Sequence, residues 1–100
     1  MDARLHTELW TSWASLLRSY AAAHGLNAKE HAVVEVSAAS IIVRVGSRWL
    51  RFTQSAMQQS EAAMVRFALT EEGLVVIGDE PAEEMDMAAE RLAREMLRAT

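Results

Sequence analysis

The stretch from Ile41 to Phe52, IIVRVGSRWLRF, decides the fold of this chain. Apolar side chains recur at alternate positions on both sides of the dipeptide Gly46-Ser47. A period of two is typical of a half-buried β-strand, and glycine before a small polar residue favours a two-residue hairpin turn because glycine tolerates a positive φ. The stretch therefore predicts a β-hairpin that turns at Gly46-Ser47.

The same turn predicts which residues face one another. A two-residue turn pairs Arg44 with Trp49 and Ile42 with Arg51, because successive side chains alternate between the two faces of the hairpin. The predicted core face carries Ile41, Val43, Leu50 and Phe52, and the predicted outer face carries Ile42, Arg44, Trp49 and Arg51. Two arginines and a large aromatic side chain thus share the outer face.

Alternation extends to both sides of the hairpin. It predicts a strand near residues 32–36, a turn of small residues at 37–40, and two strands at 65–69 and 74–77. Pairing Leu69 with Leu74 would place Val76 beside Phe67 in the core, and Arg66 beside Ile77 on the outer face. The polar stretch from Thr53 to Glu61 interrupts the pattern, and we expect a loop or a short helical turn there.

The first 24 residues predict an amphipathic helix. Apolar residues spaced by three and four form its stripe, namely Leu5, Leu9, Trp13, Leu16 and Tyr20. Asp2 suits the N-cap, and Gly25 stands where a left-handed residue often ends a helix. We therefore expect the helix to end near His24.

A second amphipathic helix is predicted at the end of the chain. Pro81 suits its first position, and its apolar stripe comprises Met85, Ala88, Ala89, Leu92 and Met96. The order of helix, about five antiparallel strands and helix indicates an α+β fold with both helices on one face of the sheet. At 100 residues, the chain is long enough for one domain, which we assign to residues 1–100.

Composition excludes several classes of function. There is no cysteine, which excludes disulfides, thiolate zinc sites and cysteine nucleophiles. A net charge of −4 makes nucleic acid an unlikely partner, because phosphate binding needs a concentrated basic field. The sequence shows no signal peptide and no apolar run of membrane-spanning length, so we expect a cytoplasmic protein without a membrane partner.

Catalytic and metal-binding patterns are weak. His6, His24 and His31 are widely spaced and have no obvious third ligand, and helix capping explains the acidic residues from Asp79 to Asp86. The chain has no nucleophile motif and no glycine-rich phosphate loop. We expect no catalytic residue, no cofactor and no metal, and an enzyme is the less favoured class.

The outer face of the sheet is the candidate binding surface. Further apolar residues are expected on it, including Val33, Met64, Val75 and Ile77, and this is more than exposure to solvent explains. Arginine, tryptophan and methionine are enriched at protein interfaces. The predicted interface residues are Ile42, Arg44, Trp49, Arg51, Met64 and Arg66. The alternative is an exposed cation–π pair between Arg44 and Trp49 among scattered apolar residues, and both interpretations stay open.

Two classes of function follow. The first is a non-catalytic protein-binding or assembly module, most simply a homodimer formed through the outer face, with an acidic segment of another polypeptide attracted to the arginines. The second is a small-ligand binder or enzyme with a pocket between sheet and helices near Trp10, Trp13 and Tyr20. The element order and acidity resemble the small acidic secretion chaperones, α+β proteins that bind polypeptides as dimers. A helix at residues 54–61 would strengthen that resemblance.

Overall fold

The structure, a computed structural model, describes residues 1–98, in which two helices pack on one antiparallel sheet. The elements in chain order are α1 (Ala3–Gly25), β1 (Ala32–Val36), β2 (Ile41–Val45), β3 (Arg48–Phe52), β4 (Ala56–Gln59), β5 (Val65–Leu69), β6 (Leu74–Ile77), β7 (Glu83–Glu84) and α2 (Met85–Arg98). The predicted α+β class and the terminal helices are confirmed. The sheet has seven strands in this part of the chain, whereas about five were expected.

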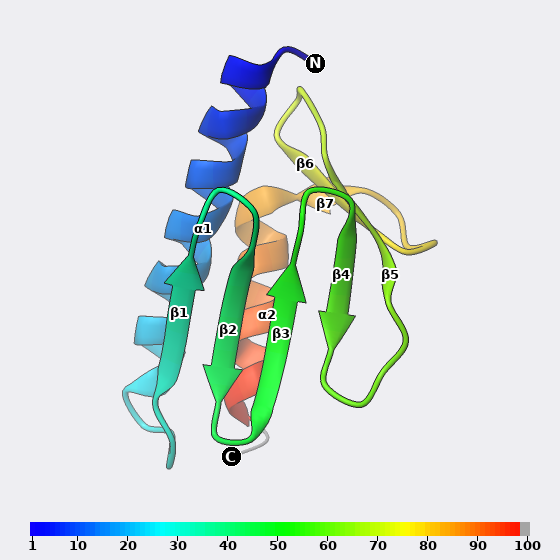
Figure 1. The fold of residues 1–100 in the computed structure, drawn as a ribbon. Coiled ribbons are helices and arrows are strands. Elements are labelled where there is room, and N and C mark those ends of the chain that lie inside the picture. The colour runs from blue at the N-terminus through cyan, green and yellow to red at the C-terminus, as the bar shows by residue number, and fades with distance from the viewer. Residues whose placement is uncertain (99–100) are drawn as a thin grey trace.

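Each strand pairs with the next one along the chain, so the sheet is a simple meander from β1 to β7. Both helices lie behind the sheet in Figure 1, α1 along β1 and α2 behind β2 and β3. The helices run in the same direction. Two side-chain hydrogen bonds connect the helices, from Tyr20 to Asp86 and between His24 and Glu90. Both pairs are 66 residues apart in the sequence, as expected for parallel helices. One face of the sheet is therefore covered by helices, and the other is left as the outer face.

The predicted hairpin is confirmed in every pair. Arg44 lies opposite Trp49, Ile42 lies opposite Arg51, and the remaining pairs follow the predicted register. Gly46 has a φ of 61°, the left-handed conformation that the turn requires. A Cβ at this position would also meet the carboxylate of Glu30, but this is the end of an exposed, flexible side chain that can move aside, so the backbone conformation is what requires glycine.

Replacing Gly46 by alanine is expected to lower the free energy of unfolding by about 1–2 kcal/mol, the usual cost of a left-handed residue with a Cβ. Gly25 supplies the matched control, because its φ is not positive and a Cβ there would meet no atom within 4 Å. Urea unfolding of both variants measures the difference. Equal stabilities of the two alanine variants would show that the turn tolerates a side chain.

The core lies between the helices and the inner face of the sheet. Trp13 is fully buried and packs edge-on against Phe52, with a ring-centroid distance of 5.4 Å, and lies 5.9 Å from the ring of Phe67. The apolar stripe predicted for the first helix agrees only in part with the buried face of α1. Trp10 and Leu17 are buried, whereas Leu9 and Leu16 are half-buried at the margin of the core. Because α1 contacts both the sheet and α2, its buried face is shifted from the predicted stripe.

The prediction for residues 53–61 is wrong, because this segment contains strand β4. Met57 points into the core opposite Phe52, and Gln58 lies on the outer face opposite Arg51. Only one of the four residues of β4 is buried, which explains why the sequence shows no clear alternation. No helix stands at residues 54–61, so the resemblance to secretion chaperones is not strengthened.

The predicted pairing of β5 with β6 is wrong by one residue. Leu69 pairs with Val75 and Phe67 with Ile77, so these valine and isoleucine side chains belong to the inner face and Val76 to the outer face. The cause is the length of the turn. Thr70 N–H donates to the Leu74 carbonyl, which leaves a three-residue loop closed by Gly73 at φ 82°.

The first helix ends within one residue of the predicted His24, but the predicted cap of this helix and the predicted start of the second helix are wrong. The C-cap of α1 is Leu26 in the right-handed region, and Gly25 is not left-handed. Asp2 does cap α1, because its carboxylate accepts a 2.8 Å hydrogen bond from Leu5 N–H. Pro81 does not begin α2, which starts at Met85. The short strand β7 intervenes because its residues pair with the end of the sheet at β6.

Candidate functional site: the outer face of the sheet

Four of the six predicted interface residues line one shallow hollow of about 240 Å³. Ile42 and Arg44 come from β2, and Trp49 and Arg51 come from β3. Their grouping follows from the hairpin register, which places the four side chains on one face in two adjacent cross-strand pairs. Ile42 and Trp49 are half-buried and the two arginines are exposed. The hollow thus combines an apolar part with two cationic side chains.

Arg44 is held by an ion pair with the neighbouring strand. Its Nε donates to Glu35 Oε1 at 2.6 Å, and both side chains are about half exposed. The ring contacts found within residues 1–98 do not include Trp49, so the cation–π pair with Arg44, which was the alternative interpretation of this face, is not among them. The ion pair neutralises the positive charge of Arg44 at the edge of the hollow.

Arg51 and Arg66 differ from Arg44 in this respect. Neither has a side-chain hydrogen bond or ion pair with any residue in the described part of the chain. They lie on β3 and β5, with Gln58 and Ala56 of β4 between them. The register of β4 aligns the two arginines across three strands. Gln58 and Ala56 were missed by sequence reasoning because this segment was not assigned to a strand.

Exposed apolar side chains extend the surface at two ends. Val33 on β1 is 54% exposed, and Met64 is 62% exposed in the loop between β4 and β5. Met64 is therefore a loop residue and not a strand residue. Because Val75 and Ile77 face inward, the apolar part of the outer face is smaller than predicted, although Val76 adds one half-buried side chain.

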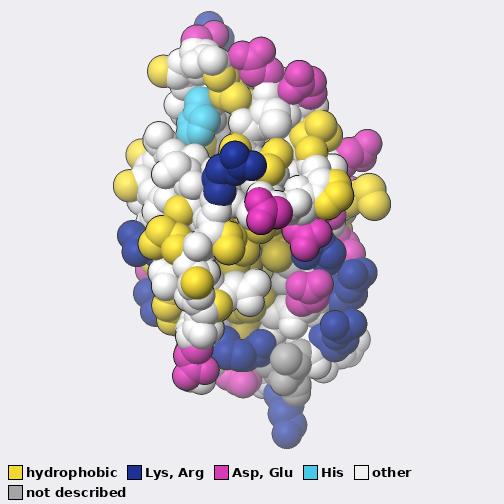
Figure 2. Space-filling view, turned by 90° about the vertical axis from the view of Figure 1, so that its right-hand side faces the viewer, with side chains coloured by type: hydrophobic (Ala, Val, Ile, Leu, Met, Phe, Trp, Pro, Cys, Tyr) yellow, Lys and Arg dark blue, Asp and Glu magenta, His cyan; other side chains and the backbone are white. Residues whose placement is uncertain are grey.

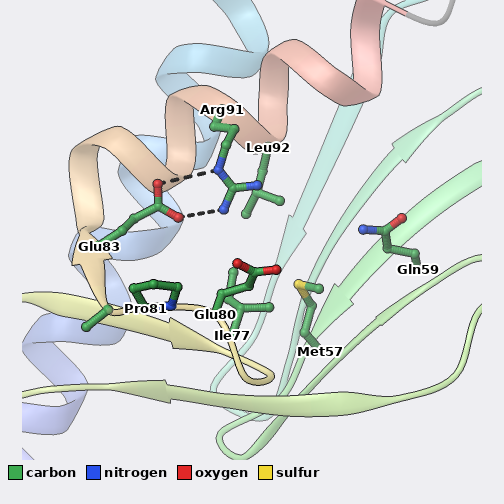
Figure 3. Close-up of a pocket in the computed structure, with 9 residues that line it drawn as sticks. Met57, Gln59, Ile77, Glu80, Pro81, Glu83, Arg91 and Leu92 are labelled. Carbon is green, nitrogen blue, oxygen red and sulfur yellow. Dashed lines mark hydrogen bonds and ion pairs between the residues drawn. The ribbon is translucent and has the colours of Figure 1, made fainter.

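A second cavity, of about 490 Å³, lies between the sheet and α2. Figure 2 shows this side of the molecule, where acidic and basic side chains surround a hydrophobic patch. Residues of β4, β6, β7 and α2 line the cavity, and Figure 3 shows eight of them by name, namely Met57, Gln59, Ile77, Glu80, Pro81, Glu83, Arg91 and Leu92. Its floor is apolar, since Met57 and Leu92 are buried.

The charged groups of this cavity are largely paired with one another. The guanidinium of Arg91 donates two hydrogen bonds to Glu83, of 2.5 and 3.4 Å (Figure 3). It also lies 3.7 Å from Glu95. These bonds to Glu83 raise the pKa of Arg91 above its ordinary value. An arginine bound on two sides by carboxylates has little capacity left for an anionic ligand.

The aromatic residues predicted to line a pocket have structural partners instead. Trp10 is buried and its indole N–H donates to the Ser37 carbonyl at 2.9 Å, while Trp13 fills the core. The Tyr20 hydroxyl donates to an Asp86 carboxylate oxygen at 2.8 Å. None of the three lines the cavity between the sheet and α2.

Tyr20 is the only tyrosine of the chain, so its ionisation can be followed directly. The hydrogen bond to Asp86, with the negative charges of Asp86 and Glu90, raises its pKa above 10.0. The neutral phenol is favoured in the folded state. Its contribution to stability is complete below pH 10 and is lost as the pH rises through the folded-state pKa.

The absorbance of tyrosinate at 295 nm is therefore expected to show a midpoint above that of the unfolded chain. Replacing Asp86 by alanine should lower this midpoint, and replacing Asp79 by alanine should not, because Asp79 does not contact the phenol. Far-UV circular dichroism at each pH is the control that the chain is still folded. A midpoint of 10 in the unsubstituted chain would contradict the hydrogen bond.

Within residues 1–98, no group of three or more histidine, aspartate and glutamate side chains is placed to hold a metal ion. No helix among the same residues has the length and apolar character that crossing a membrane requires.

The outer face combines a shallow hollow, a half-buried tryptophan and two arginines that have no side-chain partner among residues 1–98. It brings together Ile42, Arg44, Trp49 and Arg51, with Arg66 two strands away and Met64 in the adjoining loop. Comparison with protein-family models, with curated proteins and with solved structures gives no match to this chain.

Proposed function

We propose that this chain is a non-catalytic protein-binding or assembly module that acts, like a chaperone, through the outer face of its sheet. The observation that carries the proposal is the hollow formed by Ile42, Arg44, Trp49 and Arg51. Tryptophan and arginine are the residue types most enriched among interface hot spots. The helices cover the inner face of the sheet, so the outer face is the one free to meet a partner.

The partner that we propose first is a second copy of the chain. A homodimer formed through the outer face would cover Val33, Ile42, Trp49 and Met64, which are exposed or half-buried in the single chain. Light scattering at micromolar concentration tests this directly, with a dimer mass expected. A mass of one chain at all concentrations would contradict the homodimer.

Two methionines provide a matched pair for locating the interface. Met64 beside the outer face is 62% exposed, and Met87 on α2 is 61% exposed. Replacing Met64 by serine is expected to weaken the dimer about fivefold, because roughly 1 kcal/mol is lost when an exposed apolar side chain no longer becomes buried on association. Replacing Met87 by serine should leave the dissociation constant unchanged. The reverse result would move the interface to the helical side.

A second candidate function is a small-ligand binder or enzyme. The cavity of about 490 Å³ between the sheet and α2 favours binding, because its apolar floor and charged rim could hold a small organic molecule. Its lining residues include no serine, threonine, lysine or histidine, so the groups that could serve as base are the carboxylates of Glu80 and Glu83, of which Glu83 is bonded to Arg91. Replacing Ala82, an exposed residue at the rim of the cavity, with leucine should narrow the cavity and weaken ligand binding without affecting self-association.

A further inference from the structure

The charges of the outer face are unequally balanced. On strands β1 to β5, this face carries the arginines at positions 44, 51 and 66 and a single acidic residue, Glu35. Glu35 is already bonded to Arg44. Arg51 and Arg66 are left as two exposed cations without partners among residues 1–98, on a chain with a net charge of −4. The face therefore attracts negative charge although the whole protein is acidic.

The register sets the spacing of these two cations. Arg51 lies opposite Gln58, and Arg66 lies opposite Ala56, which is two residues from Gln58 on the same face. From the spacing of strands and of residues along them, the two Cα atoms are about 12 Å apart. Ala56 and Gln58 lie between the two arginines. Together with Thr53 and Met64 they line another hollow of the outer face, which is much smaller than the one at Trp49.

An extended peptide has a matching repeat. Residues four apart on a strand are separated by about 13 Å and point to the same side. Carboxylates at such positions would meet Arg51 and Arg66 together, and the residue midway between them would lie over Ala56 and Gln58. Two residues beyond the first carboxylate, an apolar side chain would reach the hollow at Ile42 and Trp49.

We infer that the polypeptide bound by the outer face is an extended acidic segment in which apolar and acidic residues alternate at every second position, with carboxylates on Arg51 and Arg66 and an apolar side chain against Trp49. This inference rests on the proposed function and specifies its partner. The homodimer proposed above would cover the apolar side chains but bring two more arginines toward the same surface, so the acidic segment is the better match for Arg51 and Arg66 and would compete with the second copy for this face.

The probe is an eight-residue synthetic peptide with blocked ends, in which leucine-serine-glutamate-serine is repeated once. Fluorescence anisotropy of a rhodamine label on the peptide measures its affinity for the full chain at low salt. A peptide with glutamine in place of both glutamates is expected to bind about tenfold more weakly, because each exposed ion pair changes affinity by roughly two- to fivefold. Binding of the acidic peptide should weaken as salt is added.

Substitutions in the protein locate the contacts. Arg51→Gln and Arg66→Gln should each reduce affinity by roughly two- to fivefold. Arg18→Gln is the matched control, because it removes the same charge from the exposed surface of α1 and should leave affinity unchanged. Arg51→Glu should chiefly slow association, since the charge steers the encounter.

The outcomes separate this inference from the proposed function. Equal affinity for the acidic and the glutamine peptides overturns the charge match but leaves a protein-binding face. Dimerisation without any peptide binding overturns the acidic partner and supports a second copy. A strictly monomeric chain that binds neither peptide contradicts both, and preferential binding of a single-stranded oligonucleotide would assign the arginines to phosphate instead.

Discussion

Replacing Trp13 by alanine is expected to reduce the free energy of unfolding by about 3–5 kcal/mol, the usual cost of removing a large aromatic side chain from a core. Trp13 has no exposed surface and packs against the rings of Phe52 and Phe67, which themselves lie 5.0 Å apart. One side chain of α1 thus holds β3 and β5 together. A domain of this size has only about 5–15 kcal/mol of stability, so the loss is a large part of it.

Urea unfolding followed by far-UV circular dichroism measures this loss, and Trp13→Phe is the control. The indole N–H of Trp13 is buried without a hydrogen-bond partner in the described structure, so phenylalanine removes an unsatisfied donor while it keeps an aromatic ring. We expect this variant to lose less than about 2 kcal/mol, because the relieved donor offsets part of the lost volume. Equal losses in the two variants would show that the indole itself is required.

Local sequence determined the best-predicted part of the fold. The register of β2 and β3 depends on a two-residue turn with Gly46 at positive φ, and both the turn and the alternation are visible in 12 consecutive residues. That register alone brings Ile42, Arg44, Trp49 and Arg51 together. Most of the candidate site could therefore be predicted before its surroundings were known.

The missed features depend on contacts between distant segments or on small differences in turn length. β4 contains alanine and two glutamines, and it becomes a strand because β3 and β5 pair with it on both sides. In the turn after β5, a loop of three residues instead of four exchanges the inner and outer faces of β6. The pairing of Arg44 with Glu35 was not predicted either, because it needs the register of β1 as well.

Replacing Trp49 by alanine is expected to weaken the outer-face complex by about 2 kcal/mol, which is roughly a 30-fold increase in its dissociation constant. Trp49 is the one aromatic side chain among the four residues that line the hollow. The backbone of Trp49 pairs with Arg44, and its main-chain N–H donates to Ser60 Oγ at 3.2 Å. Neither contact involves the indole, so both should survive the substitution. The folded structure of the sheet is therefore expected to persist while the anchor of the interface is lost.

The loss should appear mainly as faster dissociation, because related complexes differ chiefly in their dissociation rates. Subunit exchange between labelled chains measures this rate for the homodimer, and stopped-flow displacement measures it for the acidic peptide. Trp49→Phe keeps an aromatic surface and should retain most of the affinity, whereas Arg51→Glu should act on association instead. If Trp49→Ala dissociates from every partner at the parental rate, the hollow on β2 and β3 is not the centre of the interface.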